Sequence, residues 1–317
     1  MKIQSLLMSM TLLTAVLPAR GGTLDENLIS ADARWLIHAD VGQLRDNPIA
    51  AALRDQHLGD RAAEKMRQAR VMMGLETWDD LKSVVLYGTT FEHHRGVMII
   101  TAKCDRDAVI ARLKVKSNYK ATADGGHVMH SWMDGGGRKG KGGGRGRTMY
   151  LSFLPGDRAV LSRHQGDFTH AVAILDGEEP SVADGDGRLD PQVPVGASIY
   201  MQAAGPVQVP GDDHRAKLLR KVKQLNIAAV HGEGDMTMKL TLQATDAEVA
   251  MQIEQLLVGL RAMMLLRQNG PDHDETRQLI TAMSVRTEGD TVHVQWPVPN
   301  EKVSQWIARR AKKRHGG

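Results

Sequence analysis

The most unusual chemical feature of this sequence is a glycine-rich segment that is dense in cationic side chains. Residues 135–147 read GGGRKGKGGGRGR, and their five cations are Arg138, Lys139, Lys141, Arg145 and Arg147. Cations at this density bind phosphates, sulfates or anionic lipid headgroups, because each contact releases counterions from the polyanion. The segment therefore predicts a polyanion-binding loop. The alternative is a solvated connection between two strands, which a glycine-rich composition also favours.

A second basic cluster lies at the C-terminus. It consists of Arg309, Arg310, Lys312, Lys313 and Arg314. Cations there also suit the negative end of a helix dipole, so a solvated helix end is the alternative to an interaction site. The formal net charge of the whole chain is only +4, so the chain without these two clusters is acidic. Because the positive charge is local and segment 135–147 has no aromatic side chain to stack on bases, we predict no specific nucleic-acid binding.

The histidines and the cysteine could in principle bind a metal, but their spacing is unfavourable. His127 and His130 are three residues apart in an expected strand and therefore point to opposite faces. The stretch 182–193 resembles part of an EF-hand loop, but Val182 and Val193 occupy the positions of its strongest carboxylate ligands. A single cysteine excludes a thiolate zinc site. We therefore predict no metal and no cofactor.

Catalytic chemistry would have to come from residues that are distant in the sequence. The chain contains no GxSxG nucleophile elbow and no P-loop. On the first expected strand, His38 and Asp40 share the face opposite Trp35 and Ile37 and could converge in the cleft of a hydrolase. A satisfied histidine and a strand-end cap are the simpler interpretation. The sequence favours a protein that is not an enzyme.

The N-terminal residues follow the three-part plan of a secretory signal peptide. Met1-Lys2 supplies one positive charge, the run from Ile3 to Leu17 is mostly apolar, and Pro18-Ala19 interrupts it. The run is shorter than the roughly 20 apolar residues that cross a bilayer. We predict a signal peptide over residues 1–19 and a mature chain that is periplasmic or extracellular and does not span the membrane. A single cysteine suits an oxidising compartment.

Hydrophobic periodicity predicts the elements that must position these residues. Strands are expected over 34–40, 81–88, 95–103, 126–133, 148–154, 158–162, 196–204, 221–232, 235–244, 283–288 and 291–296. Helices are expected over about 47–56, 60–73, 105–113, 166–176, 246–268, 273–282 and from Asn300 onward. Segment 135–147 should therefore connect two neighbouring strands.

The order of these elements repeats along the chain. A strand–turn–strand–helix unit over 81–113 recurs over 221–268, and LPGDRAVLS (154–162) with its following helix matches TEGDTVHVQ (287–295) with the last helix. This echo predicts an α+β fold of two related modules, each a mainly antiparallel sheet with helices packed on one face. We place the first module at 20–178 with its insert at 135–147, a linker at 179–194 and the second module at 195–317.

Three pieces of the chain carry a resemblance to a protein family. ARWLIHADVGQLRDNPIAAAL (33–53), GLETWDDLKSVVLYG (74–88) and GDTVHVQWPV (289–298) together resemble exported bacterial proteins of planctomycete type that have no assigned function. The resemblance implies a signal peptide, a strand–helix opening and two related α+β halves. It implies no catalytic residues, and it identifies segment 135–147 as a variable region.

The sequence thus favours an exported, non-catalytic binding or interaction protein. Its expected partner is an unidentified protein, an anionic polymer or an anionic surface. The alternatives are an extracytoplasmic hydrolase with an unrecognised site and a structural component of the cell envelope, which repeated modules would suit.

Overall fold

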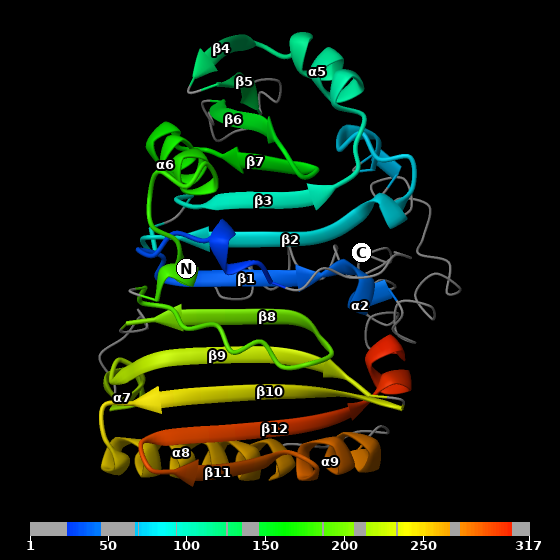
Figure 1. Ribbon diagram of the computed structural model, residues 1–317. Helices are drawn as coiled ribbons and strands as arrows, with labels where there is room; N and C mark the ends of the chain where they lie inside the picture. Colours follow the sequence, from blue (N-terminus) through cyan, green and yellow to red (C-terminus); the bar gives the residue numbers. More distant parts are fainter. Residues whose placement is uncertain are drawn as a thin grey trace. The chain divides into compact units, whose positions relative to one another are not determined.

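Antiparallel strands form the framework of both halves of the chain (Figure 1). The computed structural model describes residues 24–45, 67–68, 70–92, 94–124, 126–134, 146–185, 187–205, 214–232, 234–266 and 273–305. The chain divides into two units between Asp190 and Pro191, a point that falls inside the stretch expected to be a linker. We call the described residues up to Asp190 the first module and those from Pro191 to Gln305 the second module.

The described residues of the first module form seven antiparallel strands, the α-helices α2, α5 and α6, and a helical turn at residues 70–72. The strand order is β1-β2-β3-β7-β6-β5-β4. The strands are β1 (Trp35–Asp40), β2 (Leu81–Gly88), β3 (Val97–Ala102), β4 (Lys120–Asp124), β5 (His127–Asp134), β6 (Arg147–Leu154) and β7 (Arg158–Ser162). The helices are α2 (Val41–Arg45), α5 (Arg106–Lys114) and α6 (Gln165–Leu175), with 3-10 turns η1 (Glu26–Leu28), η2 (Trp78–Asp80) and η3 (Val182–Asp184).

Side chains that alternate along β6 pack against different helices of the first module. Leu151 belongs to a buried cluster with Val109 and Leu113 of α5. Tyr150 points the other way, and its ring lies 6.0 Å from that of Phe168 in α6. The sheet is therefore covered by α5 on one face and by α6 on the other, and its central strands are buried on both.

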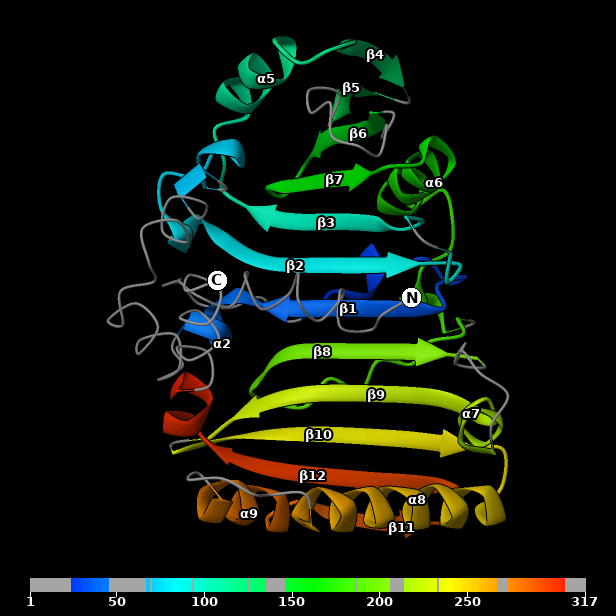
Figure 2. The same ribbon diagram turned by 180° about the vertical axis from the view of Figure 1, so that it is seen from behind.

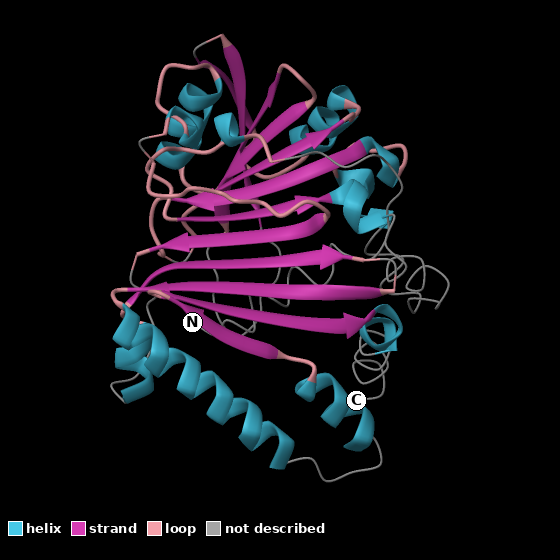
Figure 3. Cartoon of the chain, turned by 60° about the horizontal axis from the view of Figure 1, so that its bottom comes forward, coloured by secondary structure: helices cyan, strands magenta, loops and turns pink. Residues whose placement is uncertain are grey.

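The second module is a five-stranded antiparallel sheet in the order β8-β9-β10-β12-β11. Its strands are β8 (Ala197–Ala204), β9 (Val222–His231), β10 (Asp235–Ala244), β11 (Ser284–Glu288) and β12 (Thr291–Pro299), and its helices are α7 (His214–Leu219), α8 (Ala247–Leu266) and α9 (His273–Thr281). Val249 and Ile253 of α8 pack on Leu242 and Val292 of the sheet. Figure 3 shows α8 and α9 together along one side of these strands.

The opposite face of the second sheet is polar along β10 and β12. Along β10, Lys239, Thr241 and Gln243 alternate with the buried or half-buried apolar residues that face α8. Their cross-strand neighbours on β12 are Gln295, His293 and Thr291. This alternation of apolar and polar residues is typical of an antiparallel sheet with one face toward water, as the sequence pattern predicts.

The two modules share one topology, which confirms the predicted α+β fold of two related modules. Helices on one face describe the second module, whereas in the first module α6 also covers the face opposite α5, because Tyr150 and Leu151 alternate toward different helices. Strands β1, β2, β3, β7 and β6 follow each other in the first sheet as β8, β9, β10, β12 and β11 do in the second. The β4–β5 hairpin is an addition to the first module. Figure 2 shows both sets of strands from behind, with α6 beside β7 in the first module and α8, the counterpart of α5, beside β11 in the second.

Local contacts repeat with the topology. The backbone N–H of Ala102 donates to the carbonyl of Asp157 at 2.8 Å, and that of Ala244 donates to the carbonyl of Asp290 at 2.9 Å. Both aspartates follow a glycine with positive φ, at +74° for Gly156 and +59° for Gly289. A left-handed residue at this turn suits glycine, because a Cβ is strained there.

Three short elements differ from the sequence expectation. Helix α2 starts at Val41, directly after β1, because the Asp40 carboxylate accepts a hydrogen bond from the Gln43 N–H at 2.9 Å. Neither α7 nor β4 was expected, since both lack a clear apolar period. The expected helix over 47–56, most of the one over 60–73, the signal peptide over 1–19 and the C-terminal cations 309–314 lie outside the described residues.

Candidate functional site

The glycine-rich basic segment connects β5 to β6, as predicted. Asp134 is the last residue of β5 and lies opposite Arg147, the first residue of β6. The chain therefore leaves and re-enters the first sheet at a single end. Arg147 is exposed and lies on the same face as Leu151, the face covered by α5. The other four candidate residues, Arg138, Lys139, Lys141 and Arg145, lie outside the described residues.

Three further lysines gather at the same end of the first sheet. Helix α5 ends at Lys114, and β4 begins at Lys120, which lies opposite Ser131 of β5. The turn between them is held against β5, because the N–H of Met133 donates to the carbonyl of Ser117 at 2.8 Å. Lys114 and Lys120 are exposed and Lys116 is half-buried. We call Lys114, Lys116, Lys120 and Arg147 the basic end of the first module.

A buried core fixes the backbone of this basic end. Trp132 of β5 and Leu113 of α5 belong to one cluster, against which Tyr119 and Met149 also pack. The last turn of α5 and the β5–β6 hairpin are thus anchored by apolar contacts on the face below the cations. Trp132 is only 8% exposed, so its ring does not provide a stacking platform for bases.

The positive charge of the basic end lowers the pKa of a histidine inside the first module. His130 is 5% exposed, and its Nδ1 lies 2.9 Å from the Tyr119 hydroxyl. Burial is the larger of two effects that lower the pKa of His130, and the nearby positive charge of Lys114 is the smaller one. His130 is therefore a neutral core residue at pH 7. His127 lies on the opposite face and contacts the Asp176 carboxylate at 2.9 Å, which ties β5 to the end of α6.

The hydrolase candidates His38 and Asp40 do share one face of β1, as predicted, but that face is buried. His38 is 1% exposed and Asp40 is 7% exposed. The Asp40 carboxylate accepts the N–H of Gln43 and so begins α2. Their burial keeps both side chains from a substrate in solution, and the strand-end cap is the role that the geometry supports.

Two serine–histidine pairs resemble nucleophile–base arrangements but are also buried. The Ser30 hydroxyl lies 3.0 Å from His170 Nε2, and the Ser198 hydroxyl lies 2.5 Å from His231 Nε2. The two serines are 1% and 0% exposed. Burial lowers the pKa of His231 to about 4. A nucleophile must reach its substrate, so we assign these pairs a structural role.

An ion-pair cluster fixes the β2–β3 turn to the start of α6. Arg95 donates two hydrogen bonds to the Asp167 carboxylate, at 2.8 and 2.6 Å, and His164 Nδ1 lies 3.5 Å from it. Burial alone would raise the pKa of Asp167, but the hydrogen bonds and charge of Arg95 hold it below its ordinary value. The pair is bidentate and satisfied, which is typical of a structural contact. Within the described ranges, no cluster of three or more histidine, cysteine or acidic side chains could hold a metal ion.

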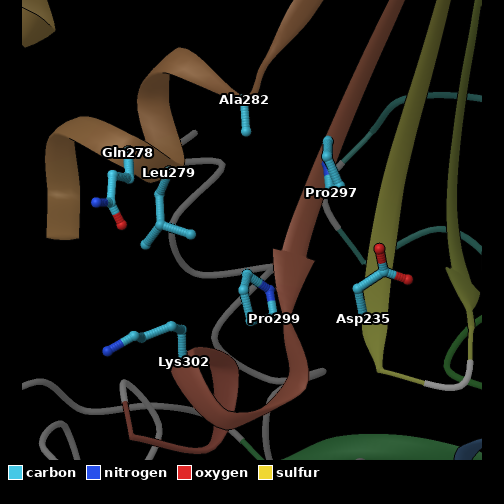
Figure 4. A pocket seen from close by; sticks show the side chains of 7 residues that line it. All are labelled: Asp235, Gln278, Leu279, Ala282, Pro297, Pro299 and Lys302. Carbon is cyan, nitrogen blue, oxygen red and sulfur yellow. The ribbon is translucent and has the colours of Figure 1, made fainter.

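A shallow pocket of about 300 Å³ lies at one end of the second module (Figure 4). Its lining is formed by Asp235, Gln278, Leu279, Ala282, Pro297, Pro299 and Lys302. In Figure 4 the Asp235 carboxylate and the Lys302 ammonium lie on opposite sides of the apolar side chains. The lining holds no nucleophile with an adjacent base, so the pocket offers no catalytic arrangement.

The sequence analysis missed the three lysines of the basic end. The run KVKSNYK (114–120) carries the signal, since it places three lysines in seven residues. Only the pairing of β4 with β5 brings this run to the same end of the first sheet as Arg147, with β5 between them. Because β4 itself was not expected, no pattern in the sequence joined the two groups.

The fold defines a class of protein: an α+β chain of two related antiparallel modules with one basic end. No family model matches the chain, and no curated protein matches it. Among solved structures it is similar to TP0453 in crystal form III, with 10% identity and a TM-score of 0.49 over 90% of this chain and 99% of that chain. Crystal forms I and IV of TP0453 give 9% and 8% identity and TM-scores of 0.46 and 0.47, with 91% and 90% of this chain and 98% and 97% of those chains covered. Likenesses of this degree carry no inference about function.

Proposed function

We propose that this chain is an exported, non-catalytic binding protein that recognises anionic polymers or anionic surfaces through the basic end of its first module. One observation carries the proposal. The segment with Arg138, Lys139, Lys141 and Arg145 joins β5 to β6 at the end where Lys114, Lys116, Lys120 and Arg147 already gather. Two sequence regions that are separate along the chain are thereby attached to the same end of the first sheet.

Binding of this kind is electrostatic and multivalent. A polyanion that neutralises several cations releases its counterions, so affinity rises with the number of contacts and falls steeply with salt. The basic end has no exposed aromatic platform among its described residues, since Trp132 is buried and Tyr150 packs on Phe168. The expected partner is therefore recognised by charge density rather than by base identity.

The proposal also includes export of the chain, which the predicted signal peptide supports. The signal peptide over 1–19 places the mature chain in the periplasm or outside the cell, where sulfated, phosphorylated and lipid surfaces are accessible. One described helix, α8, passes the length and hydropathy test for a membrane span. Its Val249, Ala250 and Ile253 side packs on the second sheet, so one side of α8 is attached to a folded module. This packing supports a mature chain that does not span the membrane.

The contacts give less support to a hydrolase. His38, Ser30 and Ser198 are each at most 1% exposed, so none of them reaches a substrate in solution. The thiol of Cys104 is half-buried, and burial raises its pKa, which opposes nucleophilic use. A screen of generic ester, phosphate and glycoside substrates with His38→Ala as control would show activity lost in the variant if the hydrolase interpretation were correct.

The test compares three forms of the mature chain on heparin and on vesicles of anionic phospholipid. In one form an Asn-Gly turn replaces residues 135–146 between Asp134 and Arg147. A second form carries Lys114→Gln, Lys116→Gln and Lys120→Gln. The control carries Lys82→Gln, Lys103→Gln and Lys221→Gln, which remove the same charge from exposed positions elsewhere.

We expect both basic-end variants to elute from heparin at lower salt than the control. Vesicles and heparin distinguish a lipid surface from a soluble polymer as the preferred source of negative charge. Equal retention of the control and the two basic-end variants would overturn the proposal, because only net charge would then matter.

A further inference from the structure

Helix α8 leaves an apolar stripe exposed on the surface of the second module. Met251, Val258 and Leu266 are 52%, 38% and 82% exposed. Together with exposed Gln255 and Ala262 they recur at intervals of four, three, four and four residues, so they share one side of the helix. Buried Val249, Ala250 and Ile253 occupy the opposite side.

Two of the charged side chains of α8 are used for attachment to the module rather than for contact with water. Glu254 accepts a hydrogen bond from the Thr287 hydroxyl at 2.6 Å, and Arg261 donates to the carbonyl of Met283 at 2.6 Å. An ordinary surface helix turns its charged residues outward and its apolar residues inward. The mean hydropathy of α8 reaches 1.4, yet only 17% of that stretch is buried. An apolar face of this extent is typical of an interaction surface.

The spacing of the stripe fits a second helix. A helix–helix seam has intervals that alternate between four and three residues, and the stripe follows this pattern from Met251 to Ala262. The centre of the stripe lies at Val258 and Gly259, midway between Met251 and Leu266. A Cβ on Gly259 would meet no atom within 4 Å, so the centre of the stripe is open to the approach of another backbone.

Spacing that is symmetric about Val258 and Gly259 allows the stripe to face a copy of itself. We propose that α8 pairs in antiparallel orientation with α8 of a second copy of this chain. A twofold axis at Val258 and Gly259 sets Met251 against the partner's Leu266 and Gln255 against the partner's Ala262. Such a contact is isologous, because each residue of the stripe meets its counterpart twice. Small Gly259 and Ala262 lie where the two helices come closest.

The exposed stripe is less suited to a lipid surface. A helix that lies in a membrane interface carries lysine and arginine beside its apolar face. Among the described residues of α8, the single cation is Arg261, and it is bonded to Met283. The geometry therefore favours a protein helix over lipid headgroups.

The size of the stripe sets the strength of the contact. From Met251 to Leu266 it is about 22 Å long, on a helix about 10 Å wide. A pair of such helices falls at or below the low end of the roughly 1,200–2,000 Å² that stable complexes bury. We therefore expect a dissociation constant in the micromolar range rather than the nanomolar range.

The test is sedimentation of the mature chain from about 1 to about 100 µM, which brackets an affinity of this class. We expect the mass to rise from one copy to two across this range. Val258→Glu puts a charge at the centre of the seam and should keep the chain monomeric. Met264→Glu is the matched control, because Met264 is 47% exposed but lies on the other side of the helix. Circular dichroism of both variants shows that they are folded.

A cross-link keeps the proposal falsifiable if a charged variant unfolds. In a Cys104→Ser background, Val258→Cys should form a disulfide between two copies on oxidation, and Met264→Cys should not. A chain that is monomeric throughout, or that dimerises equally with Val258→Glu, would overturn the proposal. Val258-dependent binding of the monomer to phospholipid vesicles would also overturn it, because the stripe would then face lipid.

Discussion

The two modules of this chain share one strand order, but one face of the sheet is apolar and buried in the first module and polar in the second. In the first module, Ile99 and Val160 lie under α6 and are at most 1% exposed. The matching positions of the second module are Thr241 and His293, as the repeated Ala102–Asp157 and Ala244–Asp290 hydrogen bonds show. Both are half-buried polar residues on the wet face of the sheet.

This difference shows what the shared topology requires and what it leaves open. The face that meets α5 or α8 is apolar in both modules, because it carries the common core. The other face needs apolar residues only where a helix covers it. The two modules therefore differ mainly outside the common core. The first module adds the β4–β5 hairpin with its basic end, and the second has in α8 a longer, partly uncovered counterpart of α5.

The largest effect should come from exchanging residues between the two matching positions. Ile99→Thr removes buried apolar surface and buries a hydroxyl under α6, so we expect a loss of about 3 kcal/mol in the free energy of unfolding. Thr241→Ile adds an apolar side chain to the wet face and should change stability by less than about 1 kcal/mol. Urea unfolding measures both. Equal losses would contradict the difference between the faces.

The next largest effect should appear on acidification. The pKa of His231 falls from 6.5 to about 4 on folding, because its ring is buried beside Ser198. Between pH 6.5 and 4 the His231 ring is protonated in the unfolded chain but neutral in the folded chain. The contribution of His231 to the free energy of unfolding is therefore complete above pH 6.5 and is lost as the pH falls toward 4. After allowance for partial exposure of the ring, we expect this loss to reach about 2 kcal/mol.

His231→Gln should flatten the pH dependence of the urea midpoint between pH 6.5 and 4. His130→Gln is the comparison in the first module, where burial and Lys114 also lower the histidine pKa. We expect the His130 variant to flatten the profile less. The account of the second module fails if the His231 variant keeps the full acid sensitivity of the parent chain.

A smaller and equal effect should come from the two Gly-Asp turns. Gly156→Ala and Gly289→Ala each force an alanine into positive φ, which costs about 1 kcal/mol. Gly234→Ala is the control, because its Cβ would meet no atom within 4 Å and its φ is not in that region. Thermal unfolding should show matching losses for the two turns and none for the control. Clearly unequal losses at the two turns would weaken the claim of duplication.

The sequence predicted the framework better than the site. Alternation located β10, because its apolar residues recur at every second position, and short apolar runs next to turn signals located β2 and β7. The repeated Gly-Asp turns and helix-starting aspartates predicted the duplication for the same reason: they are local signals. The Asp105 carboxylate does accept the Ala108 N–H at 2.9 Å, as the start of a helix requires.

The rest depended on contacts between distant residues. Strand β4 (KATAD) has no large apolar residue, so its pairing, which brings Lys120 to the basic end, has no local signal. The face shared by His38 and Asp40 was predicted correctly. Its burial was not predicted, because it follows from packing on both faces of the first sheet.

The most direct test of the central claim is a titration of the mature chain with dextran sulfate at several salt concentrations. The slope of log K against log salt reports how many cations contact the polymer. The account predicts that the variant with residues 135–146 replaced and the variant with the three lysines of the basic end replaced each have a slope lowered by about one for each cation in contact. The control variant, which lacks the charges of Lys82, Lys103 and Lys221, should show little change in slope. A slope that is the same for the two variants and the parent chain would contradict a basic end that binds polyanions.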